Sequence, residues 1–80
     1  MQQHFVYIAR CSDNTLYTGY TIDLKAREET HNSGQGARYT RGRVPIKIVY
    51  HEVYTSKSEA LKREYVIKQL TKPAKEKLIG

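Results

Sequence analysis

The sequence predicts a small α/β domain of the α+β kind, with its elements in the order ββαβαα. Two runs rich in aromatic and β-branched residues flank a turn-forming cluster near the N-terminus, and a third such run follows the middle of the chain. Stretches with helical spacing and capping residues stand between and after these runs. Eighty residues leave room for one core, so we expect one domain over residues 1–80, a three-stranded sheet with helices packed against it.

The first two strands are predicted over His4–Cys11 and Thr15–Thr21. The intervening residues 12–14 favour a turn, so the two strands form a hairpin centred near Asp13. In the first strand, odd-numbered and even-numbered residues point to opposite faces, and both sets are largely apolar. A strand covered on both faces is expected to be the central strand of the sheet.

Helical spacing and capping residues predict the other elements. A helix is expected from Asp23 to about Asn32, with Thr21 or Asp23 as its N-cap. Residues 33–45 hold three glycines and one proline and are expected to be mainly loop, with one helical turn around residues 37–40. The later elements are a strand over Ile46–Tyr54, a helix from Ser56 to about Leu70 and a short terminal helix capped by Thr71.

Charge and cysteine content narrow the class of protein. Fourteen Lys and Arg against eight Asp and Glu give a formal net charge of +6, which suits a polyanionic partner. The single cysteine, Cys11, allows no intrachain disulfide and no multi-cysteine zinc site, and it fits a reducing, cytoplasmic location. No apolar run is long enough for a membrane span and no signal peptide is visible, so no membrane partner is expected. No pattern sets the oligomeric state, and a monomer is slightly favoured.

A carboxylate stands on the apolar side of the second predicted helix. On a helical wheel Ala60 lies on the apolar stripe and Leu61 at its edge, and Glu64 falls between them. A buried carboxylate needs a cation, a hydrogen-bond network or a metal to compensate for lost hydration. Two interpretations stay open: an ion pair with Arg63 or Lys68, and a metal ligand at the floor of a cleft.

The first predicted helix places charged residues on one face. Leu24, Arg27, Glu28 and His31 follow one another at helical spacing. Arg27 and His31 could present donors to a single phosphate, and Arg engages two oxygens at once. The alternative is a solvated face on which Glu28 neutralises Arg27.

Two tyrosines of the hairpin share a sheet face. A turn centred near Asp13 pairs Tyr7 with Gly19 and puts Tyr7 diagonal to Tyr17, within reach for both phenols to line one pocket. Gly19 removes a side chain where a ligand backbone could approach closely. The alternative is that both tyrosines are half-buried packing residues.

The stretch from residue 30 to residue 51 is basic and contains no acidic residue. Such a loop can track a phosphate backbone, and a tyrosine within it can stack on an exposed base. The alternative is a solvated loop. The candidate nucleic-acid contacts are Arg38, Tyr39, Arg41, Arg43 and Lys47.

Together these residues resemble the GIY-YIG nuclease family, in particular its small single-domain bacterial branch. The two half-motifs stand as Phe5-Val6-Tyr7 and Tyr17-Thr18-Gly19, followed by Arg27, His31 and a helical Glu64. The match extends over nearly the whole chain. The resemblance implies a compact fold with a central three-stranded antiparallel sheet flanked by helices.

The resemblance also implies roles for these residues. Tyr7 and Tyr17 match the two family tyrosines, and Tyr17 matches the one usually assigned to activating water. Arg27 matches the arginine that contacts the scissile phosphate, and His31 sits where the family has His or Tyr. Glu64 matches the single carboxylate that holds the divalent metal, expected to be Mg²⁺ or Mn²⁺ because one carboxylate with waters and substrate oxygens suits a hard cation.

The chain departs from the family pattern at two places. Phe5 and Val6 replace the Gly and Ile of the first half-motif, where strand residues mainly pack. Tyr20 stands where some repair-type relatives have a lysine, which removes one cation that could assist water activation. The proton-accepting role is therefore left open between Tyr17 alone and Tyr17 assisted by Tyr7 or His31.

The expected function is a metal-dependent endonuclease that hydrolyses phosphodiester bonds in DNA. Because the chain leaves no appended domain to read sequence, we expect selectivity for DNA structure and a link to DNA repair or recombination. RNA is a further possible partner. The alternative is a nucleic-acid-binding module with the same fold and little or no turnover.

Overall fold

A computed structural model describes residues 2–80 and contains three strands and three α-helices. A π-helical turn, η1, continues directly from the first helix. In chain order the elements are β1 (His4–Arg10), β2 (Leu16–Thr21), α1 (Leu24–Thr30), η1 (His31–Gln35), β3 (Lys47–Tyr54), α2 (Lys57–Lys68) and α3 (Lys72–Ile79). The predicted order ββαβαα is confirmed.

The three strands form one antiparallel sheet in the order β2-β1-β3, with β1 in the centre. Tyr7 pairs with Gly19, as the turn near Asp13 predicts. β1 ends one residue earlier than predicted because the Cys11 N–H already bonds the Thr15 carbonyl within the turn, at 2.9 Å. β3 begins one residue later, because the Asn32 side chain bonds both backbone groups of Ile46.

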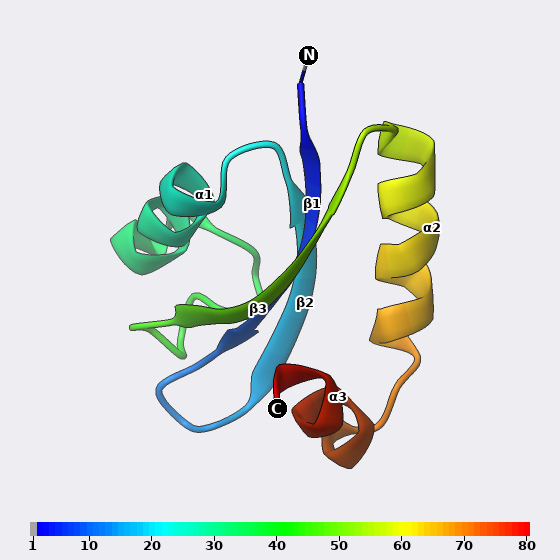
Figure 1. The fold of residues 1–80 in the computed structure, drawn as a ribbon. Helices are drawn as coiled ribbons and strands as arrows, with labels where there is room; N and C mark the ends of the chain where they lie inside the picture. The colour runs from blue at the N-terminus through cyan, green and yellow to red at the C-terminus, as the bar shows by residue number, and fades with distance from the viewer. Residues whose placement is uncertain (1) are drawn as a thin grey trace.

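Helices cover both faces of the sheet, α1 on one side and α2 on the other (Figure 1). On the α2 face Val6 and Ile8 of β1 pack against Ala60 and Ile67. On the α1 face Tyr7 and Ala9 belong to a second buried cluster, which also includes Cys11, Ile46 and Leu24. The alternation of β1 therefore supplies two cores, one on each face, as expected for a central strand.

The chain after α1 differs from the predicted simple end of a helix. α1 begins after Asp23, whose carboxylate accepts the Ala26 N–H, but its regular hydrogen bonding stops at Thr30 and widens into η1. Gly34 ends the turn with φ at +86°, a conformation that costs little only for glycine. In this wider turn the His31 side chain lies toward the sheet and is fully buried.

α2 is fixed to β3 by a half-buried hydrogen-bond network around Glu52. Arg63 donates two hydrogen bonds to its carboxylate, at 2.9 and 3.2 Å, and the hydroxyls of Tyr50 and Tyr54 donate two more. Burial opposes ionisation, but these four donors outweigh it and lower the pKa of Glu52 to about 2. Glu52 therefore stays charged at neutral pH and orients α2 on the sheet.

Candidate functional site

Four of the predicted site residues meet on the α1 face of the sheet. Tyr7 comes from β1, Tyr17 from β2, Arg27 from α1 and His31 from η1. The ring centroids of Tyr7 and Tyr17 are 6.3 Å apart, and that of His31 lies 6.2 Å from Tyr7 and 5.4 Å from Tyr17. The hairpin register and the π-helical turn together build this aromatic cluster.

Tyr7 is the buried base of the cluster. Its side chain has no exposed surface, and its hydroxyl forms a 2.8 Å hydrogen bond with His31 Nε2. Burial raises the pKa of Tyr7 to about 12, and the neighbouring Arg27 offsets this only in part. Tyr7 thus stays protonated at neutral pH and out of reach of solvent, so its hydroxyl positions His31 rather than accepting a proton from water.

His31 is bonded at both ring nitrogens. Its Nδ1 lies 2.7 Å from the Thr40 hydroxyl, which in turn donates to the Ala37 carbonyl at 2.9 Å. Thr40 is fully buried, as is His31. Burial, and next the positive charge of Arg27, lower the pKa of His31. The imidazole is therefore neutral near pH 7 and held in place by the loop and by Tyr7.

Thr40 is a site residue that sequence reasoning did not identify. It belongs to the basic stretch expected to be a solvated or DNA-tracking loop, and no periodicity marks it as buried. The one available hint in the sequence was that Thr40 is the only Ser or Thr between Gly36 and Gly42. Its contact partner lies nine residues earlier, in a turn whose geometry the sequence pattern does not specify.

We expect the free energy of unfolding to decrease as the pH falls below about 6.5, the ordinary pKa of histidine. Because the pKa of His31 is lower in the folded state, the unfolded chain binds the proton first, and each proton bound in this range favours unfolding. Urea unfolding from about pH 8 to about pH 5 measures this slope. His31→Gln should flatten it, whereas His51→Gln, at an exposed position, should leave it unchanged. Equal slopes in His31→Gln and the unaltered protein would contradict this assignment.

Arg27 and Tyr17 form the more accessible part of the site. Both side chains are half-buried, and the hydroxyl of Tyr7 and then that of Tyr17 raise the pKa of Arg27 although burial opposes this. Arg27 Nε is buried and has no hydrogen-bond partner among residues 2–80. Glu28 does not neutralise Arg27, contrary to one expectation, because its carboxylate accepts the Ile48 N–H of β3 at 2.8 Å. No carboxylate among residues 2–80 forms an ion pair with Arg27, so its positive charge is available to an anion.

Gly19 serves a different purpose from the one expected. A Cβ atom at this position would lie 2.5 Å from the Tyr7 hydroxyl oxygen and 3.0 Å from Cε2 of Tyr17. The space above Gly19 is thus filled by the two tyrosines and is not open for a ligand backbone. Glycine is required here because the buried Tyr7 phenol crosses β2 at this residue.

Glu64 lies on α2, on the other side of the sheet from α1 (Figure 1). Its side chain is 17% exposed and pairs with Lys68 at 3.4 Å, which matches the ion-pair interpretation. Arg63 was the other expected partner, but it bonds Glu52 instead. No hydrogen bond or ion pair within residues 2–80 joins Glu64 to the aromatic cluster, although its charge contributes to the raised pKa of Tyr7.

The donor set for a metal ion is small. Among residues 2–80 there is no group of three or more His, Cys, Asp or Glu side chains placed to hold one. A single carboxylate fits a hard cation such as Mg²⁺ that keeps most of its waters and takes its other ligands from a phosphate. Glu64 therefore fits a metal that arrives with substrate, and it does not fit a tightly held resident ion.

The predicted nucleic-acid contacts divide into two groups. Arg38, Arg41 and Lys47 are exposed, as a backbone-tracking surface requires. Arg43 is held within the protein by an ion pair with Asp13 at 3.1 Å, and its guanidinium carbon lies 4.2 Å from the centre of the Tyr39 ring. Tyr39 also stacks against Tyr17, with ring centroids 5.9 Å apart. Arg43 and Tyr39 thus shape the wall of the site, and a base can stack on Tyr39 only where these contacts leave its ring open.

Comparison with known proteins shows the family to which the chain belongs. The family model of the GIY-YIG catalytic domain matches residues 3–77. The chain belongs to the GIY-YIG family. GIY-YIG domains are nuclease domains, so the chain belongs to a nuclease family.

Relatives and solved structures place the chain within one branch of the GIY-YIG family. A UPF0213 protein of Staphylococcus aureus (strain N315) is 60% identical over 79 residues, which cover 99% of this chain and 96% of the relative. The solution NMR structure of the UPF0213 protein BH0048 from Bacillus halodurans has a TM-score of 0.61 and 47% identity. Protein EF2693 from E. faecalis has a TM-score of 0.64 and 38% identity, and each comparison covers 96% of this chain and 82% of the other. The expected GIY-YIG fold is confirmed.

Within residues 2–80, no helix has the length and apolar character needed to cross a membrane.

Proposed function

We propose that the protein is an endonuclease that hydrolyses phosphodiester bonds in DNA with the help of a divalent metal ion. The observation that carries this proposal is the Arg27 guanidinium, which has no carboxylate partner among residues 2–80 and lies beside the half-buried phenol of Tyr17. An arginine poised in this way binds a phosphate and stabilises the negative charge that develops on it during hydrolysis.

In this mechanism each residue of the cluster has one task. Arg27 binds the scissile phosphate and orients it toward Tyr17. The hydroxyl of Tyr17 relays the proton of the attacking water: it takes up that proton and releases its own to solvent, while a bond forms between the water oxygen and phosphorus. The bond from phosphorus to the 3′ oxygen breaks, and the leaving oxygen takes a proton from solvent. Tyr7, His31 and Thr40 are joined to one another by buried hydrogen bonds, and the rings of Tyr7 and His31 form the support against which Tyr17 packs.

Glu64 is the residue that would hold the metal ion. When bound, the ion neutralises charge on the phosphate and on the leaving oxygen. Its approach competes with the 3.4 Å ion pair to Lys68, so metal binding without DNA should be weak. Mg²⁺ and Mn²⁺ are the cations that suit this donor set.

The substrate is proposed to be DNA with a structural irregularity. The exposed Arg38, Arg41 and Lys47 provide charge for contacts to the DNA backbone, and such contacts carry no sequence information directly. Recognition of nicks, flaps or branches therefore suits the protein better than recognition of sequence. Such an activity belongs to the repair or recombination of DNA.

Cleavage assays on nicked, flapped, branched and plain duplex DNA, each with Mg²⁺ and with Mn²⁺, test this function. Glu64→Ala and Tyr17→Phe should each lower the rate by at least about 100-fold. The matched controls are Glu59→Ala and Tyr65→Phe on the exposed surface of α2, which should stay within about twofold. Equal cleavage by Glu64→Ala and Glu59→Ala would refute the mechanism.

A second candidate function is nucleic-acid binding without turnover. It is favoured by the pairing of Glu64 with Lys68 and by the lack of a direct bond from Glu64 to the aromatic cluster in residues 2–80. Binding of the same DNA panel with no cleavage in either metal would support this function and exclude the first.

A further inference from the structure

A groove extends from Arg27 toward the first turn of α2. It has a volume of about 430 Å³, and its lining includes His4 of β1, Tyr20 of β2, Arg27 and Lys57. This volume lies within the roughly 300–1,000 Å³ of typical small-ligand sites, so the groove has room for about one nucleotide unit. Lys57 belongs to no motif identified in the sequence, and the fold alone brings it beside Arg27.

The charges of this groove suit a phosphate. Arg27 and Lys57 both line it, and no Asp or Glu does. No carboxylate in residues 2–80 forms an ion pair with Lys57. Two cations that line one groove without a counter-ion from the protein create a positive potential that attracts polyanions.

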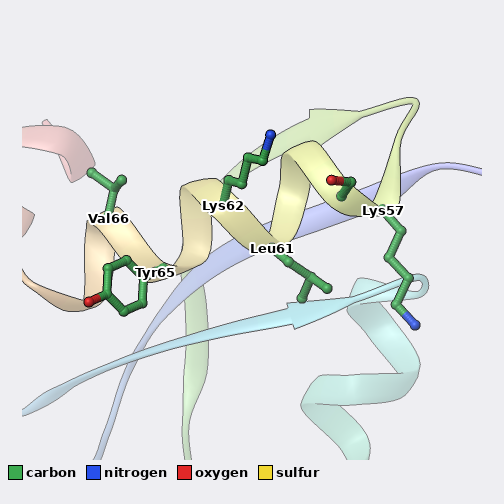
Figure 2. A pocket seen from close by; sticks show the side chains of 6 residues that line it. Lys57, Leu61, Lys62, Tyr65 and Val66 are labelled. Atoms are coloured by element: carbon green, nitrogen blue, oxygen red, sulfur yellow. The ribbon is translucent and has the colours of Figure 1, made fainter.

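The position of Lys57 is set by Tyr20. The ammonium lies 5.9 Å from the centre of the Tyr20 ring, within cation–π range. The Tyr20 hydroxyl is bonded to His4 Nδ1 at 2.7 Å, and the two rings stack 6.0 Å apart. Figure 2 shows a neighbouring pocket along α2, which Lys57 and Lys62 both line; in it the Lys57 side chain leaves the first turn of α2 and reaches toward the C-terminal end of β2, away from Lys62.

We propose that Lys57 binds a second phosphate of the DNA strand, adjacent to the one bound by Arg27, with Tyr20 and His4 as the wall against which the intervening nucleotide packs. This inference rests on the proposed function only for the binding of DNA at Arg27. Lys57 positions the strand and does not act on the reacting atoms. The ligand is a phosphodiester in either case, so both DNA and RNA strands satisfy its chemistry.

The first test measures binding of a fluorescent nicked duplex in EDTA, over a series of salt concentrations. Lys57→Ala should weaken binding about three- to tenfold and reduce the slope of log affinity against log salt by about 0.9, the value for one lost phosphate contact. Lys57→Arg should restore most of both. Lys62→Ala removes the same charge from an exposed position on α2 that does not line this groove, and it should change affinity by less than about twofold. Equal losses in Lys57→Ala and Lys62→Ala would overturn the proposal.

A second test locates the phosphate. In a set of DNA probes, each phosphate in turn is replaced by a neutral methylphosphonate. One replacement should weaken binding of the unaltered protein and have no further effect on Lys57→Ala, because the same contact is already lost. Additive losses at every position would refute a direct contact. Neither test measures cleavage, so a failed nuclease assay leaves this result standing, and unchanged binding by Lys57→Ala leaves the nuclease proposal standing.

Discussion

Arg27→Lys is expected to lower the single-turnover rate of DNA cleavage by at least about 100-fold while weakening DNA binding by less than about fivefold. Lysine keeps the positive charge, so attraction to the backbone persists. It cannot present the planar fork of a guanidinium, which in the proposed mechanism binds the phosphate while it also interacts with the Tyr7 and Tyr17 hydroxyls. The rate constant at saturating enzyme and the dissociation constant in EDTA separate the two effects.

The matched control for this prediction is Arg38→Lys. Arg38 is an exposed arginine of the basic loop, and its expected role is to contact the backbone by charge. Its replacement by lysine should change both the rate and the affinity by less than about twofold. If Arg27→Lys were as active as Arg38→Lys, the fork of Arg27 would have no part in the chemistry, and the proposed mechanism would be wrong.

Periodicity predicted the sheet well because each strand obeys a simple rule. The alternation in β1 assigns Val6 and Ile8 to the α2 face and Tyr7 and Ala9 to the α1 face, and the structure agrees. The short turn after β1 then fixes the register that pairs Tyr7 with Gly19. These features depend on neighbours in sequence, which is why a single sequence was enough to predict them.

The parts of the site that were missed depend on contacts between distant residues. Spacing and the family motif predicted Tyr7, Tyr17, Arg27 and His31 as site residues, and the structure brings these four side chains together. Thr40 was not found, because it reaches His31 only after η1 widens the helix and the following loop folds back. Likewise, the open space expected above Gly19 is filled by a phenol, and no pattern in the sequence indicates which side chain occupies such a space.

Gly36→Ala should be the most destabilising small substitution in the loop, at a cost of about 2–3 kcal/mol or more. A Cβ atom there would lie 2.2 Å from His31 Nδ1 and 2.7 Å from the His31 Cα atom. His31 cannot move aside, because Tyr7 and Thr40 bond its two ring nitrogens and the backbone is part of η1. Relief of the overlap must therefore displace the imidazole, which also loosens Tyr7 and lowers any nuclease activity.

The control for Gly36→Ala is Gly42→Ala, in the same loop. A Cβ atom at Gly42 meets no atom within 4 Å, and the backbone there is not in the left-handed region, so its stability should change by less than about 0.5 kcal/mol. Thermal unfolding should separate the variants by roughly 10 °C or more, given about 4–8 °C per kcal/mol for a domain of this size. Nearly equal melting temperatures would mean that the loop around Gly36 does not hold the His31 side chain rigidly. A wide separation, with the His31 ring signals in NMR spectra displaced only in Gly36→Ala, would show that the loop clamps the imidazole and so fixes the floor of the site.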